Sequence, residues 1–262
     1  MGNEPPASSR KQGRLLRAAL VFFPVGTVIF GIASFGIWWQ KRQHVEARSF
    51  QFAAAVRQDL NAASVERYVS ILRDVLSQPE DRRLPAVASF LDSSMGAENM
   101  GYAVRREPFQ AGGFELANVD VELTGKHRPR EIILVLAPYG DRAKLEAECH
   151  ALAALMSLAH AVTGENRAVT LRFAGVPIGV KDNDGRTGLE RFAAACRDRE
   201  ERLMQVHVLG GPSEANLQDI RKTFRAEVSG TVVHGLPATV DTPTTLAAAA
   251  ALKTFLMGEI AK

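Results

Sequence analysis

The feature that most limits how this chain can fold is an early segment without charged side chains, which runs from Ala18 to Trp39. A helix of this length, at ~1.5 Å per residue, spans about the ~30 Å hydrocarbon core of a bilayer. Pro24 and Gly31 would weaken a helix in water but are tolerated in lipid, and Trp38 suits the membrane interface. The sequence therefore predicts one transmembrane helix over residues 18–39.

The residues on either side of this segment predict its fate and its orientation. A cleaved signal peptide is the alternative, but small residues should then follow a shorter apolar stretch, and here the chain continues with Trp38-Trp39-Gln40-Lys41. More basic residues precede the segment than follow it: Arg10, Lys11, Arg14 and Arg17 against Lys41 and Arg42. The positive-inside rule then leaves residues 1–17 in the cytoplasm. We expect a single-pass protein of the cell membrane, anchored in the bilayer through residues 18–39, with a periplasmic or extracellular domain.

Composition excludes two other classes of protein. Apolar residues make up 46 % of the chain and charged residues 23 %, which is typical of a folded protein and unlike a disordered one. The basic flanks of the anchor account for the net charge of +3, because the charges of the remaining chain nearly balance. No basic stripe is interleaved with aromatic residues, so we expect no nucleic-acid partner.

Hydrophobic periodicity predicts the organisation beyond the anchor. We expect a helical juxtamembrane linker over residues 40–64 and one domain over 65–262. The predicted helices lie between 45 and 76, with a break near Asn61 and Ser64, and at 84–95, 142–162, 188–202, 214–226 and 245–260. The predicted strands lie at 101–109, 118–123, 131–137, 168–174 and 203–209. This alternation predicts an α/β sandwich of three layers, with a central, mostly parallel mixed sheet flanked by helices.

Several stretches, in order, resemble the di-zinc aminopeptidases of metallopeptidase family M, number twenty-eight. The resemblance covers roughly residues 65–260. It lies in these stretches: Gly101-Tyr102 with Pro108-Phe109, Asn118-Val119 with Gly125, Ile132 to Ala137, Ala151 to Met156, Phe192 to Arg199 (as in a bacterial branch) and Asp241-Thr242-Pro243 with Leu246. It implies a zinc-aminopeptidase-like fold, while function must be argued from the site.

The family's activity depends on two zinc ions, held by carboxylates and histidines, and on a carboxylate base. The positions that match its ligands are Pro138, Glu146, Gly210 and Pro237, and only Glu146 has a metal-binding side chain. No acid stands in the stretch 175–179, where the base should follow a strand. Together with the predicted anchor, the resemblance therefore implies a membrane-anchored, catalytically inactive member that serves as a binding or scaffolding module, with no cofactor and an unidentified protein or peptide partner.

Two alternatives stay open for the site. One is an active hydrolase with a rearranged zinc site, for which the weak candidates are Glu146, His150, His234 and Asp241. Glu146 and His150 are four residues apart on one helix, a spacing that can chelate a metal but more often gives a simple polar pair. The other alternative keeps the old substrate cleft as a peptide or amino-acid pocket.

Two further patterns have a simpler interpretation beside the functional one. Cys149 and Cys196 fall in predicted helices, where small buried side chains are the simpler interpretation and a disulfide between them is the alternative. The stretch 182–185 resembles part of a calcium loop, but its register lacks the required acids, so we expect a polar turn.

Overall fold

The computed structural model describes residues 34–35, 55–141, 144–165, 167–210, 214–224, 231–234 and 240–259. The chain divides into two units, Met1–Phe50 and Gln51–Lys262, and every element described below belongs to the second unit. Apart from Ser34 and Phe35, the predicted anchor at 18–39 lies outside the described residues, as do residues 1–17 and 40–54. Among the described residues, no helix is both long enough and apolar enough to cross a bilayer.

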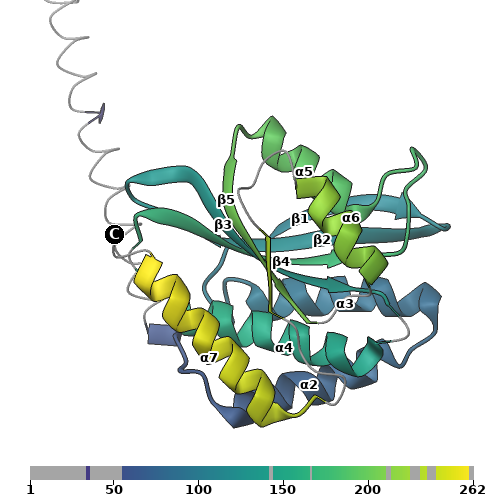
Figure 1. Cartoon of the computed structure of the whole chain (residues 1–262), viewed down its shortest axis with the longest axis horizontal. Coiled ribbons are helices and arrows are strands. Elements are labelled where there is room, and N and C mark those ends of the chain that lie inside the picture. The colour runs from purple at the N-terminus through teal and green to yellow at the C-terminus, as the bar shows by residue number, and fades with distance from the viewer. Residues whose placement is uncertain are drawn as a thin grey trace, which may run out of the picture. The chain divides into compact units, whose positions relative to one another are not determined.

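The second unit is a three-layer α/β sandwich, as the sequence predicts (Figure 1). Its strands are β1 (Arg105–Ala111), β2 (Phe114–Leu123), β3 (Arg128–Tyr139), β4 (Val169–Pro177), β5 (Arg202–Leu209) and β6 (Thr231–His234). Its helices are α2 (Ala62–Leu76), α3 (Glu80–Met95), α4 (Leu145–Val162), α5 (Gly188–Asp198), α6 (Glu214–Phe224) and α7 (Thr242–Glu259). The predicted boundary at residue 65 falls inside α2.

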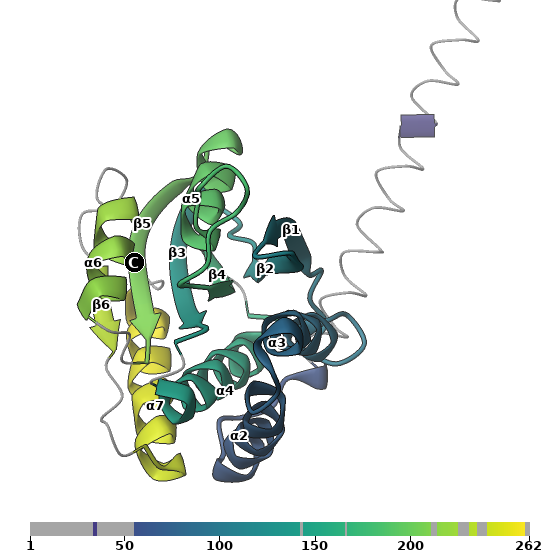
Figure 2. The same ribbon diagram turned by 90° about the vertical axis from the view of Figure 1, so that its right-hand side faces the viewer.

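The sheet is mixed and mostly parallel, with the strand order β1-β2-β4-β3-β5-β6. β3 runs parallel to both β4 and β5, and β5 runs parallel to β6. β1 and β2 are antiparallel to their neighbours and form one edge. Helices α2, α3, α4 and α7 cover one face, and α5 and α6 cover the other (Figure 2).

The central strand shows why this arrangement follows from the sequence. The run 131–137 is apolar without alternation, and in the structure its side chains are divided between two cores. Ile133 and Val135 pack under α4, whereas Ile132 and Leu134 pack under α5 and α6. A strand covered on both faces requires this continuous apolar run, so the prediction for it is confirmed.

Local signals set the helix ends. The side chain of Asn61 accepts a hydrogen bond from the backbone N–H of Ser64 at 2.8 Å, which caps the start of α2 where the sequence predicts a break. Thr187 and Glu190 form a reciprocal capping box at the start of α5. The stretch 182–185 is the expected polar turn, in which the Asp182 carboxylate accepts from the backbone of Asp184.

Two elements differ from the sequence prediction. The strand predicted from residue 101 begins only at Arg105, because Gly101 has a φ of 82° and closes a turn onto the carbonyl of Gly96. The short edge strand β6 was not predicted from the sequence. Four residues are too few to establish a strand period, and β6 forms by pairing with β5.

A buried arginine ties the antiparallel edge to the parallel part of the sheet. Arg172, on β4, is fully buried, and its guanidinium binds both carboxylate oxygens of Glu201, one of them at 2.6 Å. It also donates to Glu122 of β2 at 2.9 Å and lies 3.4 Å from Asp120. Although burial opposes the shift, hydrogen bonds from Arg172 and Arg199 lower the pKa of Glu201 to about 2.

Replacing this arginine should be costly. We expect Arg172→Ala to lower the free energy of unfolding at pH 7 by about 3–5 kcal/mol, because it leaves buried carboxylates without a counter-charge. The deficit should shrink as the pH falls from about 4.5 towards 2, since Glu201 keeps its charge in the folded wild-type protein over that range and loses it in the unfolded chain. Urea unfolding followed by circular dichroism measures both effects.

Arg130→Ala is the matched control for Arg172→Ala. Its partner is Glu200, and both side chains are more than two-thirds exposed, so the change should cost less than about 1 kcal/mol. Equal losses for the two variants would contradict the importance assigned to the buried cluster.

Candidate functional site

The two connections that leave β3 and β5 run to opposite faces of the sheet. The chain passes from β3 into α4 on one face and from β5 towards α6 on the other. In open α/β sheets, ligands bind where neighbouring strands diverge in this way, just beyond the carboxyl ends of the strands. This edge of the sheet is therefore the place to look for a site.

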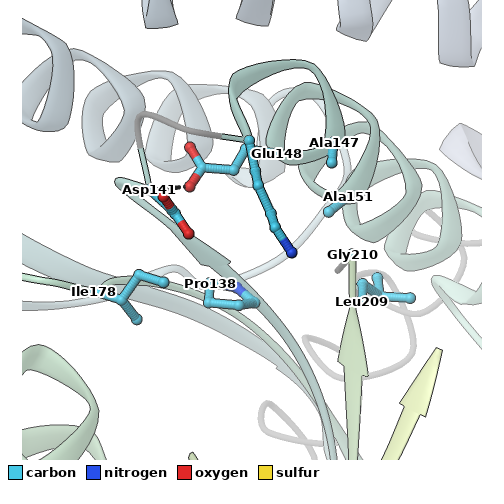
Figure 3. A pocket seen from close by; sticks show the side chains of 9 residues that line it. Pro138, Asp141, Ala147, Glu148, Ala151, Ile178, Leu209 and Gly210 are labelled. Atoms are coloured by element: carbon cyan, nitrogen blue, oxygen red, sulfur yellow. Dashed lines mark hydrogen bonds between the residues drawn. The ribbon is translucent and has the colours of Figure 1, made fainter. Parts of the chain in front are cut away.

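A small pocket lies at this edge (Figure 3). Its lining comes from the ends of β3, β4 and β5 and from the first turns of α4. The lining residues are Pro138, Asp141, Lys144, Ala147, Glu148, Ala151, Ile178, Leu209 and Gly210. The interior volume is about 10 Å³, which is room for about one water molecule.

Glu148 is the buried acid of the pocket. Its carboxylate accepts a hydrogen bond from the backbone N–H of Asp141, which begins the loop after β3. Burial raises the pKa of Glu148 to about 7, although the backbone N–H groups of Gly140 and Asp141 act in the opposite direction. The carboxylate of Asp141 accepts from the side chain of Asn216 on α6 at 3.4 Å. The acids of the pocket therefore bind the protein's own groups.

Three of the four family-matched positions are described, and their surroundings differ. Pro138 and Gly210 line the pocket, where neither offers a side chain that could bind a metal. Glu146 does not line it: its side chain is 44 % exposed and forms an ion pair with Arg73 of α2. Pro237 lies outside the described residues.

Sequence reasoning singled out Glu146 and missed Glu148. The two positions are about 200° apart around a helix, so one faces the solvent and the other the pocket. Ala147 and Ala151, which both approach the strand ends, mark the inward face of α4 and could have pointed to Glu148.

Two of the weak candidates do meet on α4. The imidazole Nε2 of His150 lies 3.5 Å from the Glu146 carboxylate, and its Nδ1 lies 2.7 Å from the hydroxyl of Thr245. That hydroxyl donates to the backbone carbonyl of Asp241 at 2.9 Å, so it accepts from Nδ1–H of His150. Burial lowers the pKa of His150, which favours the neutral ring. This chain of contacts links α4 to the start of α7.

The remaining candidates have structural explanations or lie where no contact is described. The carboxylate of Asp241 accepts from the backbone N–H of Thr244 at 2.8 Å and caps α7. His234 is the last residue of β6 and pairs with Leu209, which places its backbone at the carboxyl edge of the sheet.

The two cysteines do not form the disulfide that the sequence left open. Both are free and buried, Cys149 in the core under α4 and Cys196 in the core under α5. The sheet separates them, so they are the small buried side chains of the simpler interpretation.

The described residues around the pocket do not supply the ligands of the zinc pair that the resemblance implies. A catalytic zinc ion takes about three protein ligands. Within the described ranges, no three His, Cys, Asp or Glu side chains gather in a way that could hold a metal ion. Glu148, the buried acid of the pocket, is bound to a backbone N–H group instead.

Comparison with solved structures agrees with the predicted fold. A Bacteroides vulgatus protein assigned as a zinc-dependent exopeptidase matches with a TM-score of 0.51 and 13% identity, over 75% of this chain and 96% of that one. A glutaminyl cyclase from Macrostomum lignano matches with a TM-score of 0.53 and 14% identity, over 79% and 92%. No protein-family model and no curated protein matches the sequence. The chain therefore shares the zinc-exopeptidase-like fold, and at this identity the likeness extends to the fold alone.

Glu148 should make stability depend on pH. Its folded pKa of about 7 lies above the ordinary value of 4.5, so the stabilisation is complete below about pH 4.5 and is lost as the pH rises to about 7. The loss should be on the order of 2–3 kcal/mol. Glu148→Gln keeps an acceptor for the Asp141 N–H group and should remove this dependence. Unfolding free energies at pH 5 and pH 8 test it, and equal pH profiles for wild type and variant would contradict it.

Proposed function

We propose that this protein is a membrane-tethered, catalytically inactive domain with a zinc-aminopeptidase-like fold, which acts as a binding or scaffolding module. The observation that carries the proposal is the lining of the pocket at the carboxyl edge of the sheet. Pro138, Ala147, Ala151 and Gly210 line it without a group that could bind a metal, and the carboxylates of Glu148 and Asp141 accept hydrogen bonds from a backbone N–H group and from Asn216. The described lining therefore lacks the three or so ligands that hold a catalytic zinc ion and its water molecule.

The active-hydrolase alternative draws support from the contact between Glu146 and His150. Both groups, however, already have protein partners. Glu146 pairs with Arg73, and Nδ1 of His150 is hydrogen-bonded to Thr245. A metal ion would have to displace Arg73 from Glu146 and reach the buried imidazole ring of His150. We therefore favour the inactive domain over a rearranged zinc site.

The size of the pocket argues against the alternative in which the site binds a peptide or an amino acid. Sites for small molecules usually enclose about 300–1,000 Å³. The space at the carboxyl edge is about 10 Å³, so a peptide or amino acid would need the lining to move. A binding partner is expected to use the outer surface of the domain instead.

Measurements of metal content and turnover test whether the domain is catalytically inactive. The full chain, purified in detergent and dialysed against zinc, should hold much less than one zinc ion per chain. It should turn over neither aminoacyl anilides nor peptides with N-terminal glutamine. Stoichiometric zinc with turnover would overturn the proposal. Loss of both in His150→Gln, but not in Lys181→Gln on the exposed turn, would then identify the rearranged site.

Membrane extraction tests the tether. The full chain should stay in the membrane fraction after alkaline carbonate, because a transmembrane helix is held by burial of its apolar side chains and not by charge. A variant that lacks residues 18–39 should be released. Protease added to cells whose outer membrane or cell wall has been made permeable should cleave the domain if it is exported. Release of the intact chain by carbonate would contradict the anchor.

A further inference from the structure

The amino end of the parallel sheet, opposite the pocket, carries a basic surface. Lys126 lies in the turn between β2 and β3, and Arg128 and Arg130 lie at the start of β3; all three are exposed. The side chains of Arg128 and Arg130 are 50% and 71% exposed, even though each contacts a glutamate. The turn and the start of β3 therefore present three cations to the solvent.

This turn continues into a second basic segment, just before β4. The backbone N–H of Lys126 donates to the carbonyl of Arg167 at 2.7 Å. The Arg167 side chain is only 6% exposed, its Nη2 contacts the sulfur of Met257 on α7, and its Nε has no hydrogen-bond partner. A buried guanidinium with an unused donor is costly, because the group has left water without a full set of partners.

Met257 also lines an open groove between α7 and the residues that precede α2. The other lining residues are Asp59, Leu60, Ala250, Lys253 and Thr254, and the groove encloses about 490 Å³. Close by, Arg57 pairs with Glu165, which lies 3.5 Å from Arg167. The turn, the buried arginine and the groove are thus joined by direct contacts, and Figure 1 shows the end of α7 near the turn between β2 and β3.

Cations outnumber acids over this surface, which we call the basic end. Its exposed and half-exposed cations are Arg57, Lys126, Arg128, Arg130, Arg202 and Lys253, and Arg167 lies buried beneath them. Its acids are Asp59, Glu131, Glu165 and Glu200, and the last three pair with arginines of the same surface. An excess of Lys and Arg on one surface attracts anionic headgroups, since guanidinium and ammonium groups both bind phosphate.

The chain enters the domain at this surface. Residues 57–60 contribute Arg57 to the basic end and two residues to the groove. Under the proposed anchor, the seventeen residues 40–56 separate the bilayer from Arg57, and even fully extended they span at most about 60 Å. Along the chain, the basic end therefore contains the described part of the domain that is nearest to the anchor.

We propose that the basic end lies against an anionic lipid surface, with phosphate headgroups contacting the turn and entering the groove beside Lys253. The inference rests on the proposed membrane tether and adds to it a second, electrostatic contact. With the amino end of the sheet on the lipid, the carboxyl edge and its pocket face away from the membrane. Each basic side chain at an anionic surface contributes about fivefold to binding, so several together give a stable orientation.

Lysine acetylation of the full chain tests the proposal. The protein is incorporated into nanodiscs of phosphatidylcholine alone or with added phosphatidylglycerol, and the labelling rate of each lysine is read by mass spectrometry. Lys126 and Lys253 should react several-fold more slowly in the anionic discs. Lys181 and Lys222, which are exposed elsewhere on the domain, are internal controls and should react equally in both. High salt should remove the protection, because it screens the contact.

A charge variant and the control discs decide the interpretation. Arg128→Gln with Arg130→Gln removes two exposed cations and should lessen the protection of Lys253 in anionic discs, while Lys181→Gln should not. Circular dichroism checks that both variants fold. Equal rates in the two kinds of disc would overturn the proposal, as would protection of all four lysines alike.

Failure of the tether gives a different result. A chain without an anchor would not enter nanodiscs at all. The same labelling, with the chain added to vesicles containing phosphatidylglycerol, then tests the basic end separately: unchanged rates at Lys126 and Lys253 would overturn it there too.

Discussion

The parallel pairing of β3 with β4 and β5 is the constraint on which the rest of the structure depends. Each of these strands is covered on both faces, so its backbone groups are satisfied only by its neighbours in the sheet. Parallel neighbours need long crossovers, and α4 and α5 supply them on opposite faces. The divergence of α4 and α6, which follow β3 and β5 onto opposite faces, creates the pocket edge, and the opposite ends of the same strands carry the basic end. Both surfaces are consequences of one topology.

The sequence predicted the parts of the fold that depend on local periodicity. The apolar run in β3 and the cap at Asn61 could be recognised from neighbouring residues alone. The cluster around Arg172 could not, because its carboxylates come from Asp120, Glu122 and Glu201, which are distant in the chain. A charged residue within a predicted strand shows only that a partner is needed. It does not show which partner the fold will bring.

The candidate site was predicted in part, for a similar physical reason. That Pro138 and Gly210 stand where metal ligands would be expected follows from the order of the elements, and both do line the pocket. The sequence singled out Glu146, whereas the buried acid that lines the pocket is Glu148, two residues further along α4. On a helix, an offset of two residues moves a side chain from one face to another. A resemblance in sequence alone therefore cannot show which acid faces the pocket. The cluster of Glu146, His150 and Thr245 also required contacts between α4 and α7 that no spacing encodes.

The separation of the two cysteines by the sheet has a consequence for how the protein matures. In the folded domain, burial raises the pKa of both thiols to about 12, so neither is a ready nucleophile for disulfide exchange. In an unfolded chain both thiols are open to oxidants. A bond between Cys149 and Cys196 would join residues that belong on opposite sides of the sheet, and β3 could not insert between them. If the domain is exported, as proposed, its core has to close before oxidation reaches it, and a thiol-reducing helper would then raise the yield of correctly folded protein.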